Sequence, residues 1–234
     1  MLVDLQGQID EVIDRPHGSW PAAFAGGAQL LRGVRGKSTI SIMPGNETMT
    51  VILDIDLDYF ALFKQPVRRL EKILAWAERP VDFMVRHHHE AFRQWRRLAE
   101  DGAIRPPHLI IHLDEHHDMM SETPPVNFGS FMYFAMRQWS ECQVYWVMPQ
   151  PIDYPDMWLS AEAWDTVSSR FSHFKRFRQQ WPKPDLVSVC TSPGFIDERL
   201  SQRLVERVRG RPVKREAGAR TDDQGGEGQG HQEG

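Results

Sequence analysis

Two short stretches of the chain concentrate side chains that bind metal ions. Residues 111–120, IHLDEHHDMM, follow an apolar run and hold three acidic and three histidine side chains. Residues 53–60, LDIDLDYF, place an aspartate at every second position. Carboxylates gathered at the end of a buried strand repel one another and lose their hydration unless a cation neutralises them. A divalent cation therefore explains both stretches better than a solvated loop.

Alternation along the chain selects candidate ligands, because alternate residues of an extended segment point to one side. One such set comprises Asp54, Asp56 and Asp58, and the other comprises Asp114, His116 and Asp118. Carboxylate oxygens with a minority of imidazole nitrogens favour Mn²⁺, with Fe²⁺ or Zn²⁺ less favoured.

The neighbours of these candidates are interpreted differently. His112 lies inside the apolar run and is expected to be a core histidine. Glu115 and His117 are expected to point away from the ligand face, toward solvent or behind the ligands. A third polar stretch, HHHE at residues 87–90, is expected to supply one more histidine ligand, although parity does not choose among its histidines.

The elements that must position these residues alternate along the chain between strand-like and helix-like spacing of apolar residues. Strands are predicted at residues 50–56, 81–85, 108–114, 143–148 and 184–190, and helices at 65–80, 90–102, 130–139, 161–177 and 196–210. This alternation predicts an α/β three-layer sandwich with a mostly parallel sheet. Ligands of open parallel sheets bind at the carboxyl ends of the strands. Polar residues follow four of the five predicted strands, including Thr191 and Ser192 after the last.

The two ends of the chain differ from the domain predicted over residues 49–210. Residues 1–48 are weakly patterned, with one short candidate strand near 38–43, and are expected to pack on that domain. Residues 211–234 are rich in Gly, Gln and charge, and predict a disordered tail.

Composition narrows the class of protein. A formal charge of -4 over 234 residues argues against a nucleic-acid partner. Apolar runs stay short of the ~20 residues of a membrane span. The first residues do not resemble a secretory signal. Cys142 and Cys190 lie in predicted buried segments, which indicates reduced thiols. We therefore expect a cytoplasmic protein, and the sequence leaves homo-oligomer formation open.

Five motifs together carry a family resemblance: ILDIDLDYF, HHHEAF, HLDEHHDM, NFGSF and TSPGF. Residues 114–118 resemble the DAHxD signature of the arginase (ureohydrolase) superfamily. Asp56 and Asp58 resemble the paired aspartates of its SxDxD motif, with Asp54 in place of the serine. The combination is most similar to the small bacterial branch that contains the peptide arginases. The resemblance implies an enzyme with two Mn²⁺ ions that converts arginine residues of a ribosomally made precursor peptide to ornithine and urea.

The resemblance also implies roles for individual residues. Asp56 and Asp114 would bridge two ions, with Asp58 and His116 on one and His88 and Asp118 on the other. Asp118 would orient the nucleophile, and His89 or His117 would protonate the departing amine. Glu90, with Glu198 as second choice, would bind the guanidinium group. The peptide main chain would contact Asn127, Ser130 or the turn that begins at Ser192.

Alternative functions remain open at this stage. Another metal-dependent C–N hydrolase of the superfamily, such as a deacetylase, would use a single Zn²⁺ and a tyrosine. A phosphatase of the DxD type would also begin with a strand like ILDIDLD. A metal-stabilised peptide-binding module would bind metal without turnover.

Overall fold

The computed structural model describes residues 49–150 and 153–210, so the predictions for residues 1–48 and 211–234 lie outside the described part of the chain. The strands are β1 (Val51–Asp56), β2 (Phe83–Val85), β3 (Leu109–Leu113), β4 (Gln143–Val147), β5 (Phe171–Phe174) and β6 (Leu186–Cys190). The α-helices are α2 (Pro66–Ala77), α3 (His88–Glu100), α4 (Phe131–Gln138), α5 (Ala161–Val167) and α6 (Glu198–Arg209). The 3₁₀ helices are η1 (Asp58–Leu62), η2 (Pro155–Met157) and η3 (Ser168–Arg170).

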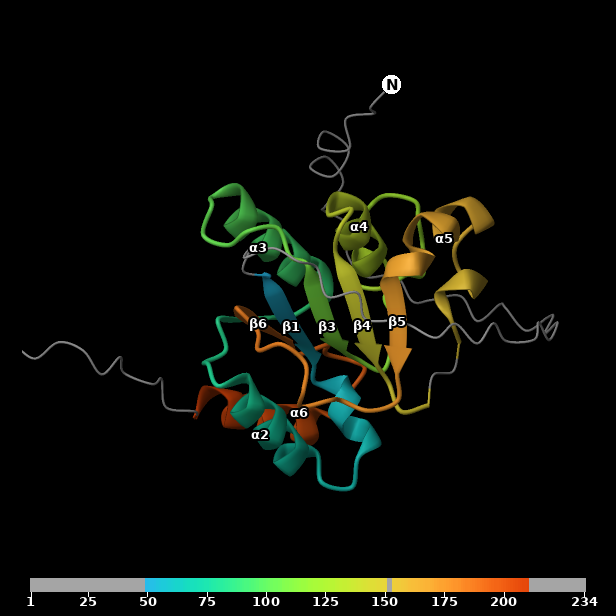
Figure 1. Ribbon diagram of the computed structural model, residues 1–234. Coiled ribbons are helices and arrows are strands. Elements are labelled where there is room, and N and C mark those ends of the chain that lie inside the picture. The colour runs from blue at the N-terminus through green and yellow to red at the C-terminus, as the bar shows by residue number, and fades with distance from the viewer. Residues whose placement is uncertain (1–48, 151–152, 211–234) are drawn as a thin grey trace, which may run out of the picture.

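The six strands form one parallel sheet in the order β2-β6-β1-β3-β4-β5. Every residue of β1, β3 and β6 is buried, as expected for central strands covered on both faces. The predicted three-layer α/β sandwich is confirmed (Figure 1). Among the described helices, none has the length and apolar character needed to cross a membrane.

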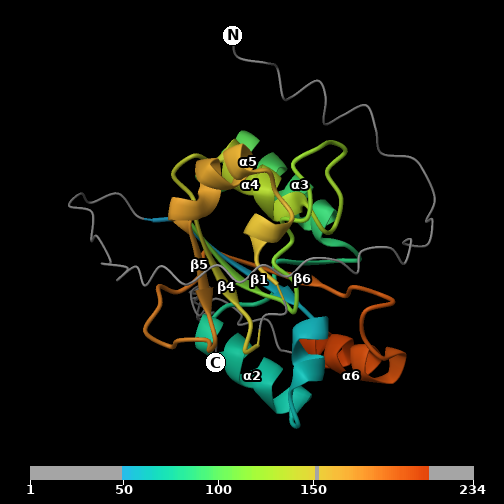
Figure 2. The same cartoon turned by 90° about the vertical axis from the view of Figure 1, so that its right-hand side faces the viewer.

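The two faces of the sheet carry separate cores. Helices α3, α4 and α5 cover one face, and α2 and α6 cover the other (Figures 1 and 2). Ile52 and Ile110 pack in the first core with Trp95 of α3. Leu53 and Ile111, one residue further along the same strands, pack in the second. The period of two along each strand thus assigns alternate side chains to opposite cores.

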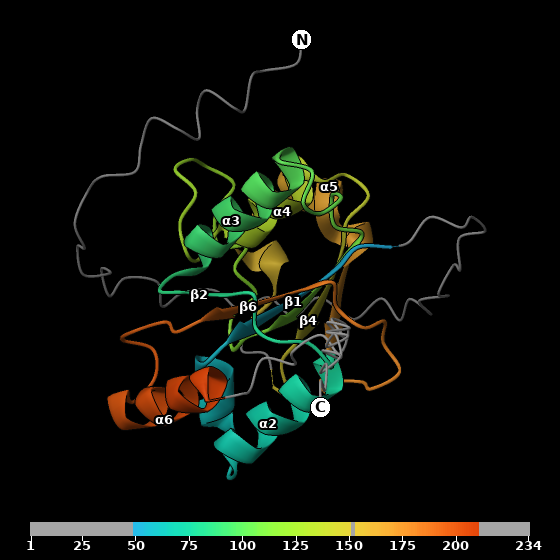
Figure 3. The ribbon, with the colours of Figure 1, turned by 90° about the vertical axis from the view of Figure 1, so that its left-hand side faces the viewer.

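Three polar residues interrupt the apolar pattern of the central strands at one level. Asp54 of β1 is in register with His112 of β3 on one side and with Ser188 of β6 on the other. By parity these side chains face the α3–α4 layer. They lie one or two residues before the last residue of their strands, and all three are fully buried. Figure 3 shows the strands β6 and β1 side by side, between that layer and the α2–α6 layer.

One predicted element is wrong. Residues 161–177 do not form a single helix, because α5 ends at Val167 and, after η3, the chain enters the edge strand β5. Phe171 of β5 packs in the first core, whereas Phe174 packs against the second. An extended segment buries both aromatic rings on opposite faces, and a helix at the sheet edge would not. The sheet consequently has six strands rather than the five predicted.

Candidate metal centre

A cavity of about 270 Å³ opens at the carboxyl ends of β1, β3 and β6. Its polar lining consists of Asp56, Asp58, His88, Asp114, His116, Asp118 and Ser192. The rest of its lining is Met120, Phe128, Gly129, Trp158 and Phe195. The polar residues are buried apart from His116, whereas Trp158 and Phe195 are 42% and 47% exposed. The cavity therefore has an acidic, histidine-containing floor and an apolar mouth.

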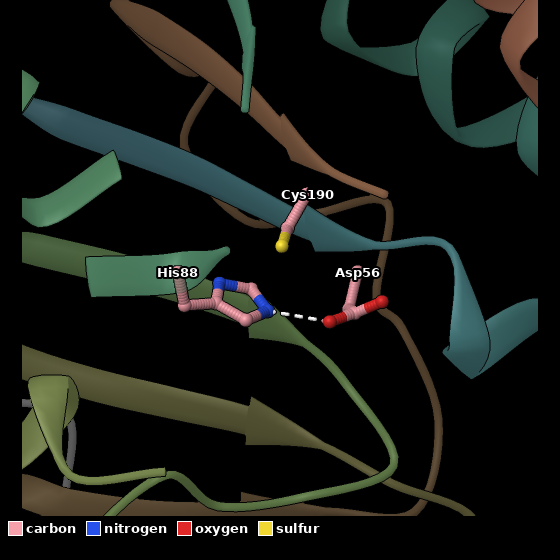
Figure 4. Close-up of side chains that lie close together, drawn as sticks. All are labelled: Asp56, His88 and Cys190. Atoms are coloured by element: carbon pink, nitrogen blue, oxygen red, sulfur yellow. Dashed lines mark hydrogen bonds and ion pairs between the residues drawn. The ribbon is translucent and has the colours of Figure 1, made fainter. Parts of the chain in front are cut away.

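His88, on helix α3, lies close to residues at the carboxyl ends of three strands. It lies in the first turn of α3, and its Nε2 is 2.6 Å from Asp56 Oδ2 and 3.0 Å from Asp114 Oδ2. The same nitrogen is 3.9 Å from Asp118 Oδ2. Figure 4 shows the ring of His88 directed at the carboxylate of Asp56. We call His88, Asp114 and Asp118 the inner cluster, since their ligand atoms lie within 4.8 Å of one another.

A second group lies beside the first. Nδ1 of His116 is 3.4 Å from Asp58 Oδ2 and 3.4 Å from Asp114 Oδ1. We call Asp58, Asp114 and His116 the outer cluster, because the His116 side chain is 33% exposed. Asp114 contacts His88 with one oxygen and His116 with the other, so it belongs to both clusters. The structure thus brings together all six residues expected to bind metal.

These residues converge even though their segments are not extended. Asp58 lies in η1, and residues 114–118 follow the end of β3 as a turn. The main-chain N–H of His116 donates to Asp114 Oδ1 at 2.6 Å, and Asp118 has a φ of 52°. The alternation predicted by strand parity is therefore reproduced by turns. Those turns direct Asp114, His116 and Asp118 into one cavity.

The donor set fits a divalent cation on two grounds. Among the described residues, Asp58 Oδ1, Asp118 Oδ2 and His112 Nε2 are buried and have no hydrogen-bond partner. Burial raises the pKa of Asp58 and of Asp118 well above the ordinary range, and the charge of Asp114 adds to the increase in both cases. A cation stabilises crowded carboxylates that are costly to ionise and buried acceptor atoms that have no hydrogen-bond partner.

Asp54 lies behind this centre. Its alternation with Asp56 and Asp58 made it a candidate ligand, whereas the family resemblance gave it no metal-binding role. Its Oδ1 accepts a hydrogen bond from Ser188 Oγ at 2.8 Å. Its Oδ2 is 2.9 Å from His112 Nδ1 and 3.2 Å from His88 Nδ1. Burial alone would raise the pKa of Asp54, but the charge of His88 and the hydrogen bond from His112 outweigh it and hold the pKa at about 2. Asp54 is therefore an ionised carboxylate that contacts two imidazoles.

His112 is buried as predicted, but it is more than an ordinary core histidine. Its Nε2 lies 3.4 Å from Asp114 Oδ2 and 3.8 Å from Asp118 Oδ2. The signal in the sequence was parity: His112 lies two residues before Asp114, inside β3.

Cys190 lies close to the same centre, at the end of β6. Its Sγ, with the ligand atoms of Asp56 and His88, forms a further group within 4.8 Å (Figure 4). Burial raises the pKa of the Cys190 thiol to about 11. The neutral thiol is 3.4 Å from the main-chain oxygen of Arg86 and 3.2 Å from Ser192 Oγ. This geometry agrees with a reduced core cysteine that borders the site.

The two histidines expected to protonate the departing amine do not line the cavity. His117 is buried, accepts a hydrogen bond at Nδ1 from the N–H of Met119 at 2.9 Å, and places Nε2 3.7 Å from Asp153. The ring of His89 stacks on that of His87, with centroids 5.8 Å apart. The acid role expected for His89 and His117 is thus not supported by their positions.

The glutamates expected to bind guanidinium are also elsewhere. Glu90 closes a capping box at the start of α3, where its Oε2 accepts from the N–H groups of Arg86 and His87 at 2.9 and 3.2 Å. Glu198 is exposed in the first turn of α6. Neither is among the described residues that line the cavity, so their expected role in binding guanidinium stays a prediction. The carboxylate of Glu90 satisfies the free N–H groups of a helix terminus instead.

Asn127 and Ser130 shape the cavity without lining it. Asn127 accepts from the N–H of Gly129 at 2.9 Å, and Ser130 Oγ accepts from the N–H of Asn127 at 3.1 Å. Together they hold the turn that carries Phe128 and Gly129 into the cavity wall. Ser192 does line the cavity, as expected, and its hydroxyl donates to Asp56 Oδ2.

No family model, curated protein or solved structure matches this chain. The site is therefore classified by its own residues. It is a buried carboxylate–imidazole centre at the carboxyl edge of a parallel sheet, with a donor set suited to divalent cations.

Proposed function

We propose that the protein is a Mn²⁺-dependent peptide arginase, which hydrolyses the guanidinium group of arginine residues in a precursor peptide to leave ornithine and release urea. The observation that carries this proposal is the separation of charged and uncharged side chains in the cavity lining. Its floor is formed by carboxylates and imidazoles, and the other lining residues have no charged side chain. A long side chain with a cationic tip and an apolar stem matches that division.

The floor offers two adjacent positions for metal ions, with Asp114 shared between them and Asp56 beside His88. Two bound ions would lower the pKa of a water molecule enough to make hydroxide available near neutral pH. His88 and Asp118 would hold the inner ion, and Asp58 and His116 the outer one. The same negative floor attracts the cationic guanidinium group.

Asp118 has the position of a proton carrier. Its Oδ2 is buried at the cavity without a hydrogen-bond partner among the described residues. We assign to Asp118 the proton lost by water when its oxygen attacks the guanidinium carbon. The carboxyl then returns that proton to the departing side-chain amine as the C–N bond breaks.

The mouth of the cavity favours a peptide over free arginine. Phe128 and Phe195 pack edge to face, with ring centroids 5.6 Å apart, and Trp158 and Met120 lie in the same lining. Aromatic faces suit the methylene stem and the planar cation of an arginine side chain. The α-ammonium and α-carboxylate of free arginine would lose hydration at this mouth without gaining charged partners. In a peptide, neutral amides take the place of both groups.

The test is direct. Purified protein loaded with Mn²⁺ is incubated with arginine-containing peptides and, in parallel, with free arginine. Each converted residue makes the peptide lighter by about 42 Da, since hydrolysis adds water and removes urea. We expect this loss with peptides, much less urea from free arginine, and neither product with Asp118→Asn. Protein that binds Mn²⁺ yet leaves every peptide mass unchanged would instead support the non-catalytic peptide-binding module.

Metal content separates the proposal from the deacetylase alternative. A deacetylase would hold one Zn²⁺ and a tyrosine beside the metal, and no tyrosine of residues 49–150 or 153–210 lines this cavity. Two ion positions with a majority of carboxylates favour two Mn²⁺ per chain.

A further inference from the structure

A single carboxylate oxygen organises two imidazoles beneath the cavity. Oδ2 of Asp54 lies 2.9 Å from Nδ1 of His112 and 3.2 Å from Nδ1 of His88. Phe131 holds the rings from the side opposite the sheet. It stacks on His88 with an interplanar angle of 4° and meets His112 edge to face at 5.7 Å. Both rings are thus fixed in orientation as well as in position.

This arrangement decides which nitrogen of His112 carries a proton. Oδ1 of Asp54 accepts from Ser188 and Oδ2 lies 2.9 Å from His112 Nδ1, so with Asp54 accepting at both oxygens Nδ1 of His112 is the donor. A neutral imidazole has only one N–H group, and Nε2 is left with a free electron pair.

The free electron pair of His112 Nε2 points into the inner cluster. Nε2 lies 3.4 Å from Asp114 Oδ2 and 3.8 Å from Asp118 Oδ2. Neither Nε2 of His112 nor Oδ2 of Asp118 has a hydrogen-bond partner in residues 49–150 and 153–210. Three electron-rich atoms that face one another in a fully buried space repel unless a cation lies among them.

We propose that His112 is a further ligand of the inner ion, and that Asp54 is the positioning residue that presents His112 and His88 to it. The proposal rests on the proposed function only in requiring a divalent ion at the cavity floor. A metal-bound histidine commonly donates its second ring nitrogen to a carboxylate, which fixes the tautomer and increases the basicity of the ligand. Here Asp54 would do this for His112, whereas Nδ1 of His88 lies 3.2 Å from the same oxygen without a hydrogen bond in residues 49–150 and 153–210.

The proposal makes the two ion positions chemically unequal. The inner position would have two imidazoles and lie at fully buried residues, whereas the outer position has one imidazole that is 33% exposed at its side chain. Imidazole binds first-row transition metals more strongly than carboxylate alone does. We therefore expect the first equivalent of Mn²⁺ to enter the inner position, with higher affinity than the second.

The experiment counts ligand nitrogens on the first ion. Metal-free protein receives one equivalent of Mn²⁺, and electron–nuclear double resonance measures the ¹⁴N couplings. Two imidazole nitrogens are expected in the wild type and one in His112→Asn. Mn²⁺ titration should show that His112→Asn and Asp54→Asn weaken the tighter site at least ~10-fold, with the weaker site little changed. His173→Asn is the matched control, since His173 lies on edge strand β5 and contacts Met148, away from the cavity.

The outcomes separate this inference from the proposed function. A wild-type protein that binds Mn²⁺ but shows one nitrogen coupling overturns the role of His112 and leaves the arginase proposal standing. A protein that binds no divalent ion overturns both. If His112→Asn does not fold, the nitrogen count in the wild type alone decides. Unchanged Mn²⁺ affinity in folded Asp54→Asn would remove the positioning role of Asp54.

Discussion

The indole Nε1 of Trp146 donates a hydrogen bond to the main-chain oxygen of Asp114 at 3.1 Å. Trp146 is buried on β4, in register with His112 of β3. The adjacent strand β4 therefore helps to fix the segment that comes after β3. Asp114 contacts both candidate ion clusters, and its placement thus depends on a residue that touches neither ion position.

Trp146→Phe should lower both stability and metal affinity. The substitution removes the N–H donor and leaves a buried carbonyl unpaired, at a cost of about 1–3 kcal/mol in the free energy of unfolding. Trp76→Phe is the matched control, because Trp76 makes an equivalent bond to the main-chain oxygen of Gln179 in the second core. Urea unfolding and Mn²⁺ titration should show reduced stability in both variants and weaker Mn²⁺ binding only in Trp146→Phe.

Asp58→Asn should stabilise the metal-free protein while weakening the outer ion position. Asp58 is buried and has an oxygen without a hydrogen-bond partner among the described residues. Burial and the charges of Asp56 and Asp114 raise its pKa. Removing this charge should increase the free energy of unfolding without metal by on the order of 1–3 kcal/mol. The comparison is Asp82→Asn, in which a carboxylate bonded to Arg79 and to the N–H of Val187 is lost.

Thermal unfolding with and without Mn²⁺ measures both effects. Asp82→Asn should lower the melting temperature under either condition. Asp58→Asn should raise it without Mn²⁺ and reduce the gain that saturating Mn²⁺ provides. A lower melting temperature of metal-free Asp58→Asn would contradict the view that burial and the neighbouring carboxylates make Asp58 destabilising in the absence of a cation.

Phe195→Ala should weaken peptide binding and leave the metal centre intact. Phe195 lines the mouth, and its ring lies 5.6 Å from that of His116 and from that of Phe128. Loss of the aromatic wall should raise KM for an arginine peptide by about 10-fold, since one such contact contributes about 1–2 kcal/mol. Met157→Ala is the control, as Met157 is 71% exposed and outside the lining. Equal KM values for both variants would indicate that the peptide enters differently.

The pH dependence of stability should include a contribution from His117. Burial lowers the pKa of His117 to about 4, from an ordinary value of 6.5. The folded protein binds this proton less readily than the unfolded chain, so the contribution is fully present above pH 6.5 and is lost as the pH falls toward 4.

His117→Asn tests this assignment in metal-free protein. Between these pH values the wild type should lose up to about 1.4 kcal/mol per pH unit more than the variant does. Urea unfolding at pH 7, 6 and 5 gives the two curves. Curves that run parallel would assign the acid sensitivity to other groups.

Sequence patterns predicted the part of the site that depends on strand order and parity. Buried apolar runs that end in polar residues predicted a parallel sheet. Strands β1 and β3 are adjacent in that sheet, so Asp56 and Asp114 lie close together at their carboxyl ends. His88 was selected by the family resemblance rather than by parity, and the structure places it against both of those carboxylates.

Sequence reasoning misjudged several residues because the role of a side chain depends on where the fold places it. A glutamate after HHH could bind substrate or cap a helix, and only the position of α3 shows that Glu90 caps it. His112 and Asp54 obey the same parity as their neighbours, but the register that pairs them across two strands is not visible in either strand alone. The aromatic spacing of FSHF fits a helix as well as a strand, which hid β5.

Two non-glycine residues of the cavity have positive φ angles, Asp118 at 52° and Ser192 at 39°. Such backbone conformations cost on the order of 1 kcal/mol or more and persist only where the surroundings impose them. Each of these turns is therefore locally strained, and an ion bound by Asp118 would help to hold its turn in this conformation. These two turns, rather than the strands beneath them, should be where the folded protein first opens to solvent. Amide hydrogens of these turns would then exchange fastest without metal and slow most when metal binds.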